Sequence, residues 1–310
     1  MNQIHRTLDR RDFLSKSAAA GAAALGVRVL GFGAQGALAA TSIRWGSTAL
    51  PRAGQTQQEA LQALERQVGR RFSTSHHRIP WTTSVVNGYS RWAVEGGRTP
   101  IISWFARRPD RSLVSWKNIA AGDYDGWITQ QARDLRGSGW SGYFCFHKEP
   151  EDEGSAADWK AAYGRVRSIF ANVGVTNFKW VVCLIAGTYD KNPAEWMPSA
   201  PFDLLGADAN NRYRCTGRPW KSLADLFGPA RMFARSRSLD LYIVEYGCVE
   251  GEAGRKGDWF DAARTTLKSW PEVIGVSYIN ENTDCNYLID TSASALSRFR
   301  AMGDDPYFQR

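Results

Sequence analysis

Residues 142–149 read GYFCFHKE and residues 239–245 read LDLYIVE, so each is a largely apolar run that ends in a glutamate. Such runs are typical of strands buried on both faces of a parallel sheet. Other short runs rich in β-branched or aromatic residues recur along the chain. The eight predicted strands cover residues 42–46, 72–77, 100–105, 142–147, 179–186, 203–208, 239–245 and 273–279.

Segments with a helical period lie between several of these strands. They cover residues 57–68, 128–136, 156–173, 223–236 and 259–270. Ser155 and Ser222 are predicted N-caps. Strands that alternate with helices predict a parallel sheet, and eight such units match a (β/α)8 barrel, which has about 250 residues. We therefore predict an α/β fold, a single-domain (β/α)8 TIM barrel over residues 40–310.

The first 39 residues have the pattern of an export signal. Residues 9–16 read DRRDFLSK and precede an apolar stretch rich in Ala and Gly that ends in Ala37-Leu38-Ala39. This pattern is typical of a twin-arginine signal peptide. We predict cleavage after Ala39 and a periplasmic or extracellular location. The alternative, a buried or membrane-spanning helix, is disfavoured by Arg28, and we expect no membrane span in the mature protein.

Composition excludes several classes of partner. The chain has 310 residues and a net charge of +8, but its cations are scattered rather than clustered on one element with aromatic residues. We therefore expect no nucleic-acid partner, and we expect a monomer. The mature part has three histidines and no C-x-x-C motif, so we expect neither a metal site nor a cofactor.

Five cysteines lie in the mature part, where an oxidising destination permits disulfides. Cys145 and Cys183 fall in predicted neighbouring strands, and we expect them to be free thiols. Cys215, Cys248 and Cys285 follow predicted strands six, seven and eight, so a bridge within this group would brace the open face of the barrel. The sequence does not identify the pair.

Two carboxylates mark the face where a barrel performs chemistry. Glu149 and Glu245 follow strands four and seven, whose carboxyl ends lie on opposite sides of the same open mouth. A period of two places Glu149 on the side of His147, and Glu245 on the side of Leu241 and Ile243. Two carboxyl groups about 5–5.5 Å apart suit the hydrolysis of a glycoside with retention of configuration.

Four short motifs carry a resemblance to a known family. Residues 146–151 (FHKEPE) resemble the H-E-P-E stretch of proteins similar to glycoside hydrolase family 26, the β-mannanase-type family. Residues 244–247 (VEYG), 205–210 (LGADAN) and 276–280 (VSYIN) resemble the corresponding strand ends of that clan. The four motifs occur in the order that the family has, and the similarity covers nearly all of residues 42–300.

The resemblance implies that Glu149 is the general acid/base and Glu245 the nucleophile, with His147, Tyr246 and Asp208 in support. The chain departs from the family at Lys148, where the family usually has His. An ammonium favours the charged form of a nearby carboxylate, which is opposite to what an acid needs. Strand alternation would alternatively turn Lys148 away and leave His147 beside Glu149.

Aromatic and polar residues near the predicted strand ends could bind sugar rings and hydroxyls. The first candidates are Trp45, Trp104 and Tyr278, followed by Tyr189 and Trp220. Asn280 and Glu281 could bind hydroxyls or cap a loop.

These features predict an exported retaining glycoside hydrolase that acts on a β-linked polysaccharide, with mannan favoured by the family resemblance. The alternative is a catalytically inactive barrel that binds glycans at the cell surface or in the matrix, and Lys148 is the residue that favours it. The sugar, the linkage and endo or exo cleavage are left open by the sequence.

Overall fold

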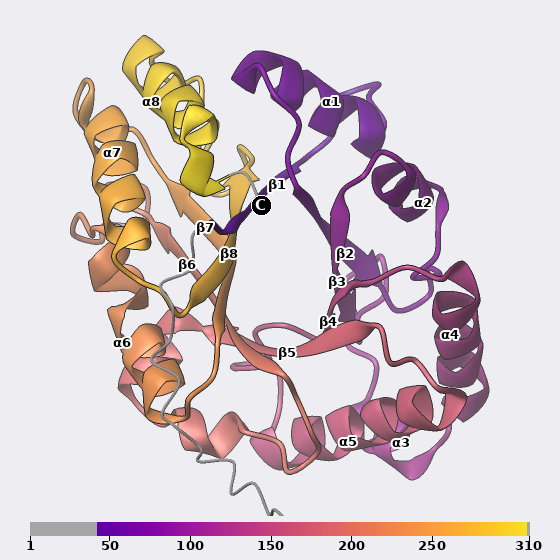
Figure 1. Ribbon diagram of the computed structural model, residues 1–310. Helices are drawn as coiled ribbons and strands as arrows, with labels where there is room; N and C mark the ends of the chain where they lie inside the picture. Colours follow the sequence, from indigo (N-terminus) through magenta and orange to yellow (C-terminus); the bar gives the residue numbers. More distant parts are fainter. Residues whose placement is uncertain (1–41, 309–310) are drawn as a thin grey trace, which may run out of the picture. The chain divides into compact units, whose positions relative to one another are not determined.

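The computed structural model describes residues 42–308, in which eight parallel strands form one closed barrel in the order of the sequence (Figure 1). The strands are β1 Arg44–Ala49, β2 Thr74–Pro80, β3 Thr99–Phe105, β4 Gly142–Phe146, β5 Phe178–Ile185, β6 Leu204–Asn211, β7 Leu241–Cys248 and β8 Val273–Asn280. β8 pairs with β1 from Gly275↔Arg44 to Asn280↔Ala49, which closes the ring. The predicted (β/α)8 barrel is confirmed.

Helices surround the barrel on its outer side (Figure 1). They are α1 Gln57–Val68, α2 Gly88–Glu95, α3 Trp116–Ala121, α4 Asp125–Ser138, α5 Ala156–Val173, α6 Leu223–Ser236, α7 Arg255–Lys268 and α8 Ala293–Asp304, with short 3₁₀ turns η1 Ala186–Asp190, η2 Pro193–Trp196 and η3 Pro306–Phe308. The predicted bounds of α1, α5 and α6 are confirmed, as are the caps Ser155 and Ser222, which accept hydrogen bonds from the backbone of Asp158 and Asp225. The sequence analysis missed α2, α3 and α8.

The core has two layers because alternate strand residues face opposite sides. Inside the barrel, the Tyr143 and Tyr242 rings lie 5.0 Å apart. Gly275 faces them, and a Cβ there would lie 2.3 Å from Tyr242, so this position needs glycine. The second layer, between the strands and the helices, is larger and holds most of the buried tryptophans. Composition could not assign the tryptophans to this layer.

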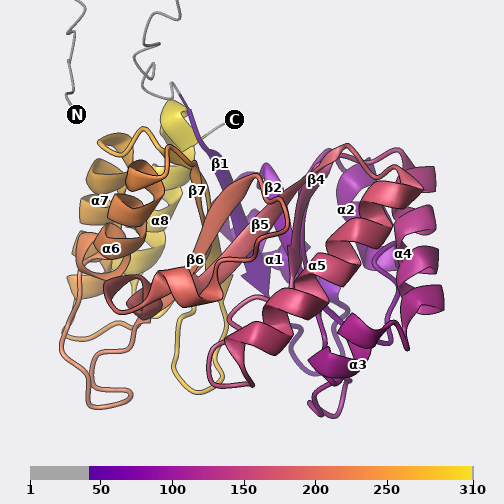
Figure 2. The same ribbon diagram turned by 90° about the horizontal axis from the view of Figure 1, so that it is seen from below.

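The carboxyl ends of the strands carry the long loops, which gather at one end of the barrel (Figure 2). This is the end at which (β/α)8 barrels bind their ligands. The predicted signal peptide lies outside the described residues. Within residues 42–308, no helix is both long enough and apolar enough to cross a membrane.

Candidate active site

A buried lysine is at the centre of a carboxylate cluster in the mouth of the barrel. Lys148 Nζ forms an ion pair with Asp208 and lies 3.3 Å from Glu245 Oε2 and 3.5 Å from Glu149 Oε2. The side chains of Lys148, Asp208 and Glu245 are at most 7% exposed, whereas that of Glu149 is 32% exposed. The structure therefore brings Glu149, Asp208 and Glu245 together, and of these Glu149 is the most open to solvent.

The shared lysine limits the separation of the two glutamates. Both Oε2 atoms lie within 3.5 Å of the same nitrogen. The two Oε2 atoms are therefore at most about 7 Å apart. This upper limit permits the ~5–5.5 Å separation of the carboxyl groups in retaining glycosidases, and also the shortest separations found in inverting enzymes. One acetal carbon can be reached from both sides within this space.

The backbone after β4 explains why Lys148 points into the mouth. His147 and Glu149 have left-handed conformations, with φ of 49° and 56°. The loop is held there by hydrogen bonds from His147 N to Trp104 O and from Glu149 N to Cys183 O, both 2.9 Å. The expectation that alternation turns Lys148 away is wrong, because β4 ends at Phe146 and the period of two ends with it.

An irregularity in β7 places Glu245 in the mouth. Tyr242 and Val244 face the interior of the barrel, whereas Leu241 and Ile243 face the helices. The pairing with β6 passes from Ala207↔Ile243 directly to Asp208↔Glu245, so one residue is extra on β7. Glu245 therefore faces inward next to Val244. The prediction that Glu245 shares a side with Leu241 and Ile243 is wrong, although its position at the mouth is right.

His147 supports the loop from behind instead of lining the mouth. The ring is fully buried, and its Nδ1 accepts a hydrogen bond of 3.0 Å from the backbone N–H of Ala106. Nε2 therefore carries the proton and donates to Glu153 Oε2 at 2.6 Å, while Arg107 holds the same carboxylate. Burial lowers the pKa of His147, although Glu153 opposes this, so the ring is neutral. The prediction that His147 binds substrate is wrong.

Arg78 and Glu281 also belong to the mouth. Arg78 forms an ion pair with Glu281, and its Nη1 lies 3.8 Å from Glu245 Oε2. The sequence analysis missed Arg78 because the predicted strand ended at residue 77, three residues before the end of β2 at Pro80. The alternation of Thr74 and His76 continues to Arg78 and could have identified it. Glu281, considered as a hydroxyl ligand or a loop cap, instead neutralises this arginine.

The charges in the cluster depend on one another. Burial alone would lower the pKa of Lys148, but the carboxylates of Asp208, Glu149 and Glu245 raise it well above its ordinary value, so the ammonium stays charged. Burial, together with the charges of Glu149 and Glu245, raises the pKa of Asp208 well above its usual range. The cluster therefore retains a proton more readily than an isolated aspartate does.

A cavity of about 340 Å³ adjoins Arg78. Ligand sites commonly have about 300–1,000 Å³. Its lining comes from the ends of β1 and β2 and the starts of α1 and α2, and includes polar side chains: Thr48, Gln57, His76, Thr83 and Asn87. These hydroxyl, amide and imidazole groups can exchange hydrogen bonds with a polar ligand.

Four aromatic residues predicted to bind substrate lie in the layer under the helices. Trp104 stacks on Trp81, with ring centres 4.3 Å apart and planes at 10°. Trp45, Tyr246 and Tyr278 are fully buried in the same layer. The prediction that these four side chains line the mouth is wrong, because their strand positions alternate with the inward-facing ones and place them on the outer face of the barrel.

The other predicted ligands also have structural roles. Asn280 Oδ1 accepts a hydrogen bond of 2.8 Å from Ile289 N, so Asn280 caps the loop after β8, which was the alternative considered for it. Tyr189 is buried and donates to Gly206 O at 2.8 Å. Trp220 is covered by the Arg255 guanidinium, 4.1 Å from the ring centre.

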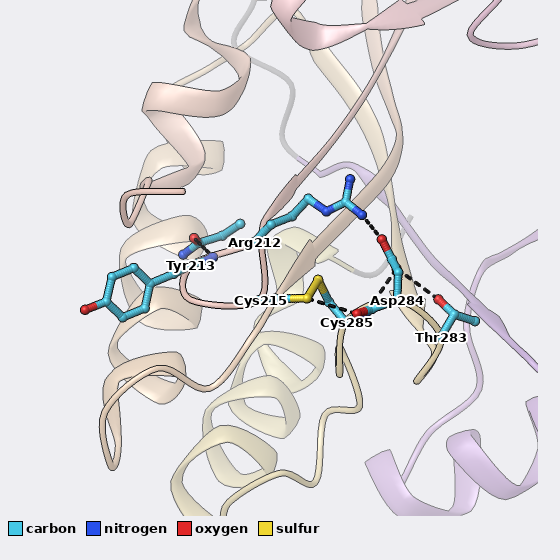
Figure 3. The surroundings of a disulfide bond; sticks show 7 residues. Arg212, Tyr213, Cys215, Thr283, Asp284 and Cys285 are labelled. Atoms are coloured by element: carbon cyan, nitrogen blue, oxygen red, sulfur yellow. Dashed lines mark hydrogen bonds and ion pairs between the residues drawn. A yellow bond between two sulfur atoms is a disulfide. The ribbon is translucent and has the colours of Figure 1, made fainter. Parts of the chain in front are cut away.

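A disulfide joins two of the loops at this end (Figure 3). Cys215, after β6, is bonded to Cys285, after β8, and Arg212 and Asp284 form an ion pair beside the bond. Cys145, Cys183 and Cys248 are free and buried. The bridge lies within the second group of cysteines, for which the sequence had left the pairing open, and the predicted free thiols at 145 and 183 are confirmed.

No protein-family model matches this chain. Over 269 residues the chain is 24% identical to Endoglucanase H of Acetivibrio thermocellus, a match that covers 79% of this chain but only 29% of that protein. A β-mannanase from a symbiotic protist of the termite Reticulitermes speratus has a similar structure, with a TM-score of 0.61, 16% identity and coverage of 86% and 88% of the two chains. The structure of the GH26 β-mannanase BoMan26A of Bacteroides ovatus is also similar, with a TM-score of 0.60 and 11% identity. The match covers 86% of this chain and 90% of that one. The resemblance to the family-26 barrel is thus confirmed in the fold.

Proposed function

We propose that this protein is a retaining glycoside hydrolase that acts on a β-linked polysaccharide. The observation that carries the proposal is the placement of Glu149 and Glu245, from the ends of β4 and β7, on one shared ammonium in the mouth. Double displacement requires two carboxyl groups about 5–5.5 Å apart, and the upper limit of about 7 Å set by the shared lysine permits this separation. The structural likeness to β-mannanases supports β-mannan as the first substrate to test.

The reaction would take place in two steps. A Glu245 carboxylate oxygen attacks the anomeric carbon, the bond to the glycosidic oxygen breaks, and the Glu149 carboxyl gives its proton to the departing oxygen. A water molecule then attacks the same carbon and transfers a proton to Glu149, and the ester bond to Glu245 breaks. The product retains the configuration of the substrate.

Exposure supports this division of roles. Glu245 is nearly buried and lies between two cations, with Lys148 at 3.3 Å and Arg78 at 3.8 Å, which fix the orientation that a nucleophile needs. Glu149 is 32% exposed, which gives it access to the leaving group and to the incoming water. Asp208 is buried and forms an ion pair with Lys148, so it would hold Lys148 in place.

The proposal includes export, for which the twin-arginine pattern of residues 9–16 is the support. A polysaccharide substrate outside the cell fits this location. Secretion of a fusion of residues 1–39 to a reporter, with and without Arg10→Lys and Arg11→Lys, would test it. Secretion that does not depend on the two arginines would contradict the twin-arginine route.

The hydrolase is tested by a panel of β-mannan, glucomannan, β-glucan and xylan assayed for new reducing ends. Glu149→Gln and Glu245→Gln should each lower the rate at least 10²-fold, since each removes a reacting group. Glu95→Gln, at the exposed end of α2, is the matched control and should retain full activity. Thermal unfolding of each variant shows that the fold persists.

The anomer released first, followed by NMR, tests the mechanism. The β-anomer is expected from a β-linked substrate, and the α-anomer would contradict double displacement. Retention of polysaccharide on an affinity gel without any release of reducing ends would contradict the enzyme and favour the glycan-binding alternative.

A further inference from the structure

Lys148 is nearly equidistant from the two proposed catalytic groups. Its Nζ lies 3.3 Å from Glu245 Oε2 and 3.5 Å from Glu149 Oε2, and its side chain is 4% exposed. Asp208 on β6 binds the same ammonium, and its side chain is 3% exposed. The backbone around Lys148 has an unusual conformation, since the residues on both sides of Lys148 have positive φ. Non-glycine residues adopt this conformation rarely, and those that do cluster at functional sites.

Negative charge moves between these two glutamates during the proposed reaction. Before the first step, the charge is on Glu245 and the proton is on Glu149. After it, Glu245 is a neutral ester and Glu149 has become the carboxylate. A cation that contacts only one oxygen would stabilise one of these states alone, whereas Lys148 contacts both. Its interaction with the charge is therefore maintained in both states.

We propose that Lys148 is a positioning residue that acts as the shared counter-charge of Glu149 and Glu245 and thereby sets the pH range in which the enzyme works. This inference rests on the proposed function. The family usually has a histidine at the position of Lys148. A lysine there matters for the pH range because it remains charged at pH values where an imidazole is neutral. This charge lies within 3.5 Å of an oxygen of each carboxyl group, so its removal should change the pH range in which the pair is active.

Other titratable groups surround the cluster and enter the same pH profile. Those near Lys148 are Asp208 on β6, Cys183 on β5 and His76 on β2. Arg78 on β2 and Tyr287 after β8 lie near Glu245, and His147 and Glu151 lie near Glu149 on its own loop. Burial keeps the pKa of His76 well below its ordinary value, and Lys148 and Arg78 lower it further, so His76 is neutral and Arg78 is the second cation of the mouth.

The test is the pH dependence of kcat/KM on the polysaccharide that the panel identifies. In Lys148→Met both limbs of the bell should move to higher pH, by about one to three units, because each carboxyl loses a cation within 4 Å. Lys148→Arg keeps the charge and should keep the limbs within half a unit of wild type. Lys117→Met makes the same chemical change on the exposed surface of α3 and should change nothing.

A substrate with a dinitrophenolate leaving group separates the two limbs, since its departing oxygen needs no proton. Its kcat/KM should lack the basic limb in the wild type and in Lys148→Met, while the acid limb moves as it does on the polysaccharide. Lys148→His provides a second variant if the methionine variant does not fold. Above the pH at which its imidazole loses its charge, its bell should resemble that of Lys148→Met.

A merely structural role for Lys148 would lower the height of the bell and leave both limbs in place. That result in Lys148→Met or Lys148→His would overturn the inference while the Glu149→Gln and Glu245→Gln results still support the hydrolase. Absence of hydrolysis by the wild type on every polysaccharide would instead overturn the proposed function, and the inference with it.

Discussion

Removal of the disulfide is expected to destabilise the domain by an amount that the sequence separation determines. Cys215 and Cys285 are 70 residues apart, and the change is the pair of substitutions Cys215→Ser and Cys285→Ser. The entropy of closing a loop of this length corresponds to about 4 kcal/mol at 25 °C. For a domain of roughly 270 residues, each kcal/mol changes Tm by about 2 °C, so Tm should fall by about 8 °C.

Thermal unfolding of the wild type with and without a reductant, beside the double variant, is the assay. The reduced wild type should match the double variant, and the reductant should leave the double variant unchanged. Cys248→Ser is the control, since the Cys248 thiol is free and buried. This variant keeps the disulfide, so its Tm should still fall on reduction. A fall in Tm of less than 2 °C in the double variant would refute the loop-closure reasoning. A Tm of the double variant that still falls on addition of the reductant would refute it as well.

Two further predictions concern residues near the mouth. Burial first, and then the charge of Glu149, raises the pKa of Glu151 to about 7, so the folded state binds this proton more tightly than the unfolded state does. Stability should therefore fall between pH 4.5 and 7, and Glu151→Gln should flatten this part of a plot of unfolding free energy against pH. Trp104→Ala should cost about 3–5 kcal/mol in urea unfolding because it removes a fully buried ring. The KM of the folded variant should stay within twofold of wild type, and a tenfold rise would restore Trp104 as a sugar ligand.

The barrel could be predicted because its signal is repeated eight times. Most of the strands show a short run rich in β-branched or aromatic residues, and an error of two or three residues at one end leaves the count unchanged. β1 was predicted at 42–46 and lies at Arg44–Ala49, yet the architecture is the same. Of the missed helices, α2 and α3 have weak signals, since they have only eight and six residues, whereas the length of α8, twelve residues, does not explain its omission.

The aromatic ligands could not be predicted because burial and sugar stacking use the same side chains. Trp45 and Trp104 occur on the strands where ligands were expected, but the layer under the helices needs large apolar groups at those positions. The side of the strand decides between the two uses. For both residues, the mouth lies on the opposite side.

The same physics explains why the two glutamates were found even though the predicted orientations of their neighbours were wrong. Position along a strand determines which end of the barrel a residue reaches, and both glutamates lie at the carboxyl end whatever the local irregularity. The side that a residue faces depends on the period of two, which the extra residue in β7 and the left-handed conformations of His147 and Glu149 interrupt. These interruptions bring Lys148 and Glu245 to the same point. Local departures from strand geometry therefore build this cluster, and a departure that collects buried charges is itself evidence of function.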